Sequence, residues 1–158
     1  SLHLIGNLQS NKVRRAIELF DVIQSVDSAK LASRIDKVAG QMGKVASIYL
    51  EINIAGEPTK NGIEPKEFDQ TIELIAECRN LNLLGLMTVP PQESDPERSR
   101  PYFRMLREMK EGINNINITG VGSCDGLSMG MTNDFDVAIE EGATLISVGS
   151  AIWGPRTS

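Results

Sequence analysis

Short apolar segments rich in β-branched residues alternate with longer segments of helical periodicity along the chain. Runs of apolar residues between turn residues predict strands, and apolar residues recurring every three or four positions predict helices. The predicted strands are Leu2–Ile5, Val22–Val26, Val45–Ile54, Leu83–Val89, a segment around Ile116–Val121 and Ser123–Ser128, and Thr144–Val148. The predicted helices are Ser10–Phe20, Ser28–Ala39, Glu67–Cys78, Pro96–Glu111 and Asn133–Glu141.

Residues typical of helix ends stand at many of these boundaries. The candidate N-caps, whose side chains accept hydrogen bonds from free backbone N–H groups, are Asn7 or Ser10, Ser28 and Asn133. Pro65 fits the first turn of a helix, where the missing N–H has no intrahelical partner to lose. The glycines expected to end helices are Gly40, Gly112 and Gly142.

Strands that alternate with helices over short loops predict a parallel sheet with right-handed crossovers. Val45–Leu50 and Leu83–Met87 are almost wholly apolar, as strands buried on both faces are. Two architectures satisfy this pattern, a doubly wound open sheet and part of a (β/α)₈ barrel. The first is disfavoured because no G-x-G-x-x-G motif follows the first strand.

Composition narrows the function classes. The chain has 158 residues, 41% of them hydrophobic and 23% charged, which is typical of one folded domain rather than of disorder. A net charge of −5 gives no basic footprint for nucleic acid. No apolar run approaches the roughly 20 residues of a membrane helix, and Ser1–Gly6 does not resemble a secretory signal.

The chain has too few cysteine and histidine residues for most sites that depend on them. Cys78 and Cys124 are the only cysteines and lie far apart, which argues against a disulfide scaffold or a zinc site and favours a cytoplasmic location. With a single histidine, His3, neither a histidine-based metal site nor a Ser-His-Asp triad is expected.

The segment Leu127–Gly154 is the strongest candidate for a site. Two consecutive predicted strands end in small residues, Ser128 with Gly130 and Gly149 with Ser150. In (β/α)₈ barrels the loops after strands seven and eight often hold a phosphate, since glycine lets backbone N–H groups approach and serine adds a hydroxyl donor. Ordinary turns between strands and helices also favour glycine and serine, so spacing alone leaves both interpretations open.

Four segments carry a longer and more specific pattern: His3–Lys12 (HLIGNLQSNK), Ile52–Ile54 with Lys60–Gly62, Gly85–Thr88, and Leu127–Gly154. Through them the chain resembles the pyridoxal phosphate homeostasis protein family, the YggS/PROSC-like proteins, over essentially its whole length. The resemblance implies a (β/α)₈ barrel like the N-terminal domain of alanine racemase. It also implies a protein that binds pyridoxal 5′-phosphate and buffers or delivers it inside the cell without turning over a substrate.

The resemblance assigns cofactor-binding positions to residues of this chain. Those aligned with the phosphate site are Ser128, Gly149 and Ser150, and those aligned with the mouth around the ring are Met87, Asn53 and His3. Lys60 matches a family lysine near the pocket, although a loop lysine that faces solvent is an equally good interpretation. For His3 and the methionines, however, packing is the commoner role.

Two departures from the family pattern qualify this assignment. Ser147 stands where the family has an arginine that faces the pyridine nitrogen, and a serine hydroxyl makes a weaker, uncharged contact there. The weak electron sink that results suits a carrier better than a catalyst. No segment matches the family's first two strands or its Schiff-base lysine, so residues 1–158 are predicted to form a single partial barrel domain with about six of the eight βα units and no catalytic residue.

Other functions remain open from the sequence. A pyridoxal-phosphate-dependent racemase or lyase of amino acids is the first alternative, and a cofactor-free barrel fragment with a role in assembly is the second. Apoenzymes that depend on pyridoxal phosphate are expected partners of a carrier, whereas nucleic acid and membranes are not expected. The oligomeric state is left open.

Overall fold

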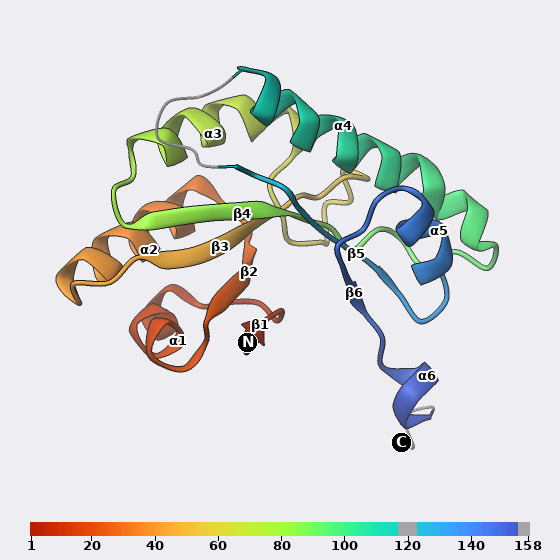
Figure 1. Cartoon of the computed structure of the whole chain (residues 1–158), viewed down its shortest axis with the longest axis horizontal. Coiled ribbons are helices and arrows are strands. Elements are labelled where there is room, and N and C mark those ends of the chain that lie inside the picture. Colours follow the sequence, from red (N-terminus) through yellow and green to blue (C-terminus); the bar gives the residue numbers. More distant parts are fainter. Residues whose placement is uncertain (117–122, 155–158) are drawn as a thin grey trace.

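The computed structural model describes residues 1–116 and 123–154, and its strands form one parallel sheet in the order β1-β2-β3-β4-β5-β6. The strands are β1 (His3–Leu4), β2 (Val22–Val26), β3 (Ala46–Glu51), β4 (Leu81–Met87), β5 (Gly126–Met131) and β6 (Leu145–Ser147). Each strand pairs with the next one along the chain (Figure 1). This sequential order is that of a (β/α) barrel.

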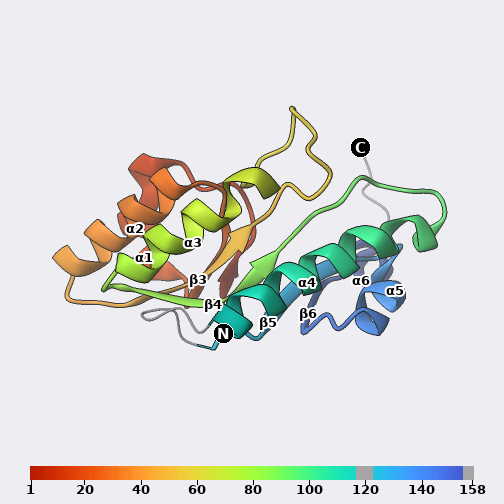
Figure 2. The same cartoon turned by 90° about the horizontal axis from the view of Figure 1, so that it is seen from above.

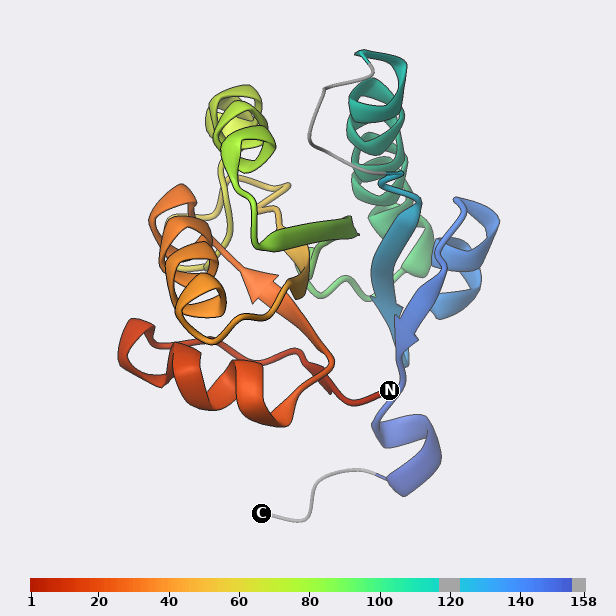
Figure 3. The ribbon, with the colours of Figure 1, turned by 60° about the vertical axis from the view of Figure 1, so that its left-hand side comes forward.

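The helices lie outside the curved sheet. They are α1 (Val13–Leu19), α2 (Ala29–Gln41), α3 (Phe68–Glu77), α4 (Arg100–Ile116), α5 (Phe135–Glu140) and α6 (Ser150–Trp153), with 3₁₀ turns at Ser10–Lys12, Pro65–Glu67 and Pro96–Ser99. Figure 3 shows α1 to α5 in an arc around the strands. Figure 2 shows α1, α2 and α3 grouped together and α4, α5 and α6 forming a second group. Because α1 to α5 cover only the outer face, the doubly wound alternative is wrong and the partial barrel is confirmed.

The hydrophobic core lies between the sheet and these helices. The largest fully buried side chains of this layer come from both strands and helices: Ile23, Ile48, Leu50, Leu86, Leu127, Ile35, Phe103 and Leu106. Each stabilises the fold by about 1.5–3 kcal/mol relative to an exposed position. A separate small cluster of Val22, Tyr49 and Met87 comes from β2, β3 and β4. Since neighbours along a strand point to opposite faces, this second cluster belongs to the interior of the barrel.

Several boundaries follow the sequence pattern closely. β2 spans the predicted Val22–Val26. Ser28 caps α2, and its hydroxyl accepts a hydrogen bond from the Leu31 N–H at 3.3 Å. Pro65 opens the 3₁₀ turn that leads into α3, and Gly142 follows α5 with a φ of 95°.

Two helices are longer than predicted. α2 continues through Gly40 to Gln41, and the chain turns at Gly43, whose φ is 64°. α4 continues through Gly112 to Ile116, so Ile116 is helical and its assignment to a strand is wrong. In α4 the buried Ile113 follows Gly112, and its burial outweighs the roughly 1 kcal/mol that an internal glycine costs. In α2 only the exposed Gln41 follows Gly40 within the helix. The rest of the predicted strand segment, 117–121, lies outside the described residues.

Two predicted caps are also wrong. The 3₁₀ turn before α1 follows Gln9 and has no side-chain cap, so neither Asn7 nor Ser10 serves as one. At α5 the N-cap position belongs to Asp134 rather than to Asn133. The Asp134 carboxylate accepts a hydrogen bond from the Met131 N–H at 2.8 Å, which joins the end of β5 to the start of α5.

A buried carboxylate attaches the end of α5 to α4. The Glu141 side chain is only 6% exposed and lies 3.1 Å from Arg100, 3.4 Å from Arg104 and 2.8 Å from Arg107. Burial alone would raise the pKa of Glu141, but hydrogen bonds from Arg100 and Arg104 and the charges of Arg104 and Arg107 lower it below its usual value. Glu141 therefore stays ionised and paired at neutral pH.

Both sheet edges are open, as expected for six strands. Within the described residues, β1 pairs only with β2 and β6 only with β5. Exposed apolar side chains gather near these edges: Leu2, Ile5, Ile146, Ile152 and Trp153.

Candidate functional site

A pocket of about 490 Å³ lies inside the curved sheet, between β1–β2 on one side and β5–β6 on the other. Its lining combines residues far apart in sequence: Ser1, His3, Ile5, Gln24, Ser128 and Leu145–Gly149. A second pocket of about 680 Å³ shares Ser147 and Gly149 with the first and continues past Ser150 to Trp153. The turn after β6 therefore borders both pockets.

This turn is held by the end of the neighbouring strand. Ser147 ends β6, Gly149 precedes α6 and Ser150 is the first residue of α6. The hydroxyl of Thr132, in the turn after β5, accepts hydrogen bonds from the N–H groups of Gly149 and Ala151, each at 3.4 Å. These hydrogen bonds hold the turn that contains Ser147, Gly149 and Ser150, which are all exposed and therefore accessible to a ligand.

A chain of hydrogen bonds crosses the floor of the first pocket. The Ser128 hydroxyl on β5 donates to Gln24 Oε1 on β2 at 2.5 Å. Gln24 Nε2 lies 2.7 Å from His3 Nδ1 on β1, and His3 Nε2 lies 2.9 Å from Ser1 Oγ. Gln24 and Ser128 are both 4% exposed, so these bonds join opposite sides of the partial barrel in its interior.

Ser128 does not lie in a turn as predicted. It is in the middle of β5, which continues through Gly130 to Met131. Gly130 has a φ of 94°, and a Cβ there would lie 2.5 Å from the Cβ of Ala138. This glycine serves the close packing of α5 on β5, a role that the sequence does not distinguish from that of a phosphate-binding glycine.

Three other predicted residues lie outside this pocket. Met87 is buried beside Val22 and Tyr49 and lines neither pocket. The Asn53 amide donates to the Glu57 carbonyl at 2.8 Å and to the Lys60 carbonyl at 3.4 Å, while its oxygen accepts from the Glu57 N–H at 3.1 Å. Lys60 Nζ lies 2.7 Å from a Glu57 carboxylate oxygen and donates to the Val89 carbonyl at 3.5 Å. Asn53 and Lys60 thus organise the loop after β3.

Three residues of interest were not anticipated. Gln24 links His3 to Ser128, and Thr132 holds the turn after β6. Glu51 ends β3, and burial together with the charge of Asp27 raises the pKa of its carboxyl to about 7. The signal for Glu51 and Gln24 was present in the sequence, since each is a polar residue within or at the end of an apolar strand.

Two features of a metal or membrane protein are absent from the described residues. Across residues 1–116 and 123–154, no three His, Cys, Asp or Glu side chains gather as metal ligands would. In the same part of the chain, no helix has the length and apolar character needed to cross a membrane.

Comparison with known proteins gives one consistent result. Residues 1–157 match the family model described as alanine racemase, N-terminal domain. The pyridoxal phosphate homeostasis protein of Aquifex aeolicus is 42% identical over 155 residues, which cover 98% of this chain and 66% of that protein. The chain thus spans about two thirds of the length of the curated relatives it matches.

Solved structures extend this result. PipY of Synechococcus elongatus, solved with PLP bound, has 33% identity and a TM-score of 0.84, with 96% of this chain and 69% of that one covered. Alanine racemase of Clostridium difficile 630 has 16% identity and a TM-score of 0.72, with 99% of this chain and 38% of that one covered. At this low identity, the similarity to alanine racemase concerns the fold alone.

Proposed function

The chain belongs to the alanine racemase N-terminal-domain family, among its pyridoxal phosphate homeostasis proteins, and from this membership we propose that it binds pyridoxal phosphate and serves the homeostasis of that cofactor. The observation that carries the proposal is the convergence of four predicted site residues on one pocket: His3, Ser128, Ser147 and Gly149. Ser150 lines the adjoining pocket, which shares Ser147 and Gly149. The PLP-bound PipY structure, which matches 96% of this chain, supports the same ligand.

The chemistry of the pocket lining suits the phosphate end of this cofactor. The exposed hydroxyls of Ser147 and Ser150 offer neutral hydrogen-bond donors to phosphate oxygens. Ser147, which lines both pockets, would donate to the ring nitrogen or to a phosphate oxygen. When bound, pyridoxal phosphate supplies a reactive aldehyde and an electron-withdrawing ring. Among the described residues that line the two pockets there is no lysine to meet that aldehyde.

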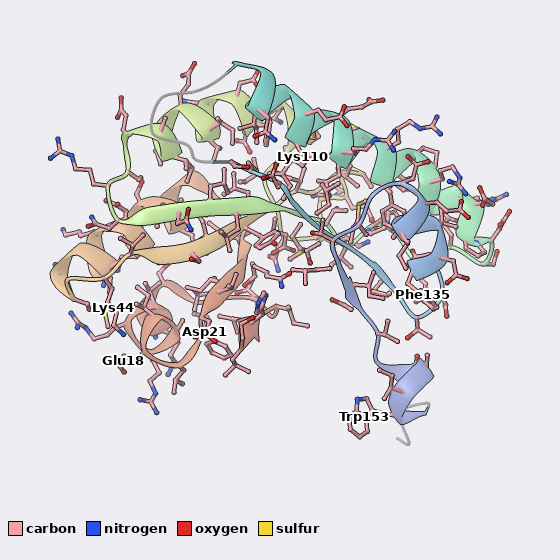
Figure 4. The ribbon with its side chains drawn as sticks, in the orientation of Figure 1. Glu18, Asp21, Lys44, Lys110, Phe135 and Trp153 are labelled. Atoms are coloured by element: carbon pink, nitrogen blue, oxygen red, sulfur yellow. The ribbon has the colours of Figure 1, made fainter. Side chains whose placement is uncertain are left out.

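Titration with pyridoxal phosphate tests the proposal, using the only tryptophan of the chain as reporter. Trp153 is 87% exposed, lines the second pocket and projects from α6 (Figure 4). We expect saturable quenching of its fluorescence. Replacing Ser147 or Ser150 by alanine should weaken binding about tenfold each, because a hydrogen bond to a charged group contributes about 1.5–3 kcal/mol.

The matched control is Ser33→Ala, which removes an equally exposed hydroxyl from α2. It should leave the affinity unchanged. Quenching that does not saturate, or that is equal in all four proteins, would contradict binding at this turn. In that case the cofactor-free role in assembly would be the better explanation.

We further propose that the protein acts as a carrier without substrate turnover, and that residues 1–158 form one partial barrel domain. Support comes from the names of the relatives and from Ser147, whose uncharged hydroxyl would be only a weak partner for the ring nitrogen of the bound cofactor. The alternative is a racemase or lyase of amino acids. Racemisation of alanine, serine or lysine above the rate of free pyridoxal phosphate would favour that alternative.

A cytoplasmic location and delivery to apoenzymes are part of the same proposal. The testable step is transfer, in which the loaded protein is mixed with an apoenzyme that depends on pyridoxal phosphate. Recovery of enzyme activity faster than with an equal concentration of free cofactor would indicate direct delivery. An equal or slower rate would restrict the role to buffering.

A further inference from the structure

The hydrogen-bond chain in the pocket floor has a direction that follows from its donors and acceptors. The Ser128 hydroxyl donates to Gln24 Oε1, so the amide nitrogen of Gln24 faces His3. An amide nitrogen carries two hydrogens and no available lone pair, so it can only donate. With the Gln24 amide in this orientation, His3 Nδ1, 2.7 Å away, accepts, which leaves the imidazole proton on Nε2.

The position of the proton determines what the pocket offers to a ligand. Nε2 is on the side of the ring that meets the exposed Ser1, whose hydroxyl lies 2.9 Å away and lines the same pocket. Ser147 lines this pocket from β6. A ligand that displaces the Ser1 hydroxyl would meet an N–H donor from His3 opposite the hydroxyl of Ser147.

We propose that Gln24 is a positioning residue that holds His3 as its neutral Nε2–H tautomer, so that the pocket presents this N–H to an anionic oxygen of the bound ligand. Gln24 is suited to this role because it is 4% exposed and both polar atoms of its amide are engaged, one on β1 and one on β5. An imidazole without this partner exchanges freely between its two tautomers. The identity of the ligand rests on the proposed binding of pyridoxal phosphate. The tautomer of His3 does not depend on that proposal, because it follows from the hydrogen bonds of Gln24.

The tautomer can be measured directly, because His3 is the only histidine of the chain. Long-range ¹H–¹⁵N correlation spectra at about pH 8.5 distinguish a protonated Nε2 from a protonated Nδ1. We expect protonated Nε2 in the unmodified protein. Gln24→Glu, whose carboxylate can only accept, should move the proton to Nδ1, and Gln24→Met should give a mixture of both forms.

Controls separate this role from a general effect on folding. Ser1→Ala removes the other partner of the ring and should leave the proton on Nε2 if Gln24 determines its position. Thermal unfolding shows whether each variant is folded, and Gln24→Met carries the test if the buried carboxylate of Gln24→Glu prevents folding. Protonated Nδ1 in the unmodified protein, or the same tautomer in Gln24→Met as in the unmodified protein, would overturn the inference.

Ligand titrations of the same samples separate this inference from the proposed function. Bound pyridoxal phosphate should shift the His3 Nε2 signals, and Gln24→Met should bind it about tenfold more weakly. Inorganic phosphate and pyridoxal, added separately, show whether the contacted oxygen belongs to the phosphate or to the ring. Saturable binding without a shift at Nε2 would overturn the contact, whereas absence of binding with the expected tautomer would overturn only the proposed function.

Discussion

At the scale of single residues, polar side chains within or just after the apolar strands have different roles. Gln24 and Ser128 are buried and hydrogen-bonded to each other across the interior. Asn53 is equally buried but satisfies its amide within its own loop. Glu51 is partly buried beside Asp27, and its carboxyl has the most clearly raised pKa of the described carboxyl groups, at about 7. Chemical type alone does not separate these roles, because each depends on where the next strand places a partner.

Glu51 should make stability depend on pH. Its pKa is raised in the folded state from the ordinary 4.5 to about 7, so the folded protein binds the proton more tightly than the unfolded chain does. Stability from this group is complete below about pH 4.5 and is lost as the pH rises to about 7. Glu51→Gln should remove this loss and stabilise the protein at pH 8 by about 1 kcal/mol, a value reduced for partial solvent exposure.

Urea unfolding at pH 4.5 and pH 8 measures this difference. Glu73→Gln, which removes one charge from the exposed side of α3, is the matched control and should show no comparable gain at pH 8. An equal gain in both variants would attribute the effect to net charge rather than to the environment of Glu51.

At the scale of elements, glycines allow strands to pack closely against neighbouring backbone and side chains. Gly85 and Gly126 are register partners on β4 and β5. A Cβ on Gly85 would collide with the backbone of Gly126, and a Cβ on Gly126 would collide with the ring of Tyr49. Gly112, within α4, has no atom within 4 Å of where its Cβ would lie. Glycine is therefore required for packing at position 126 on β5, whereas at position 112 on α4 it is not required and lowers the stability of the helix.

Alanine at these two positions should have opposite effects. Gly126→Ala should destabilise the protein by about 1–3 kcal/mol, because the added methyl group overpacks the interior against Tyr49. Gly112→Ala should stabilise it by about 0.5–1 kcal/mol, because alanine has the higher helix propensity. Denaturant unfolding of both variants measures the two values, and a Gly126→Ala variant as stable as the unmodified protein would contradict the packing argument.

At the scale of the whole molecule, the sheet is strongest in its middle. β3 and β4 pair along their length, from Ala46 with Leu81 to Glu51 with Met87. β1 contributes two residues and β6 three, and each of these strands has a single neighbour in the described structure. Parallel strands gain stability from neighbours on both sides, so resistance to local opening should fall from the centre to the edges.

Hydrogen exchange should follow this order. Amides of β3 and β4 should exchange last and those of β1 and β6 first, by a factor of at least about 100, which corresponds to about 2.7 kcal/mol of local stability. Measurement by NMR or mass spectrometry resolves the strands individually. Saturating pyridoxal phosphate should slow exchange preferentially in β6 and the following turn, because the proposed site lies there. Equal protection of all six strands would show that the edges are not weaker.

The sequence by itself determined the alternation of strands and helices, the partial barrel and the family, because apolar periodicity and long motifs are local properties of the chain. It also indicated the turn at Ser147–Ser150, which lies beside both pockets. It did not place Gly112 correctly, because burial of Ile113 beyond it outweighed the low helix propensity of glycine, and α2 continues one residue past Gly40.

Only the tertiary structure decided which residues meet in the pocket. Gln24 and Ser128 are 104 positions apart, and their hydrogen bond exists because the sheet curves until β2 faces β5. Asn53 and Lys60, although equally conspicuous in the sequence, are directed into their own loop by bonds to Glu57. The physical reason is that side-chain partners across a barrel depend on strand register and sheet curvature, and these are set by the packing of all the helices together rather than by any one segment.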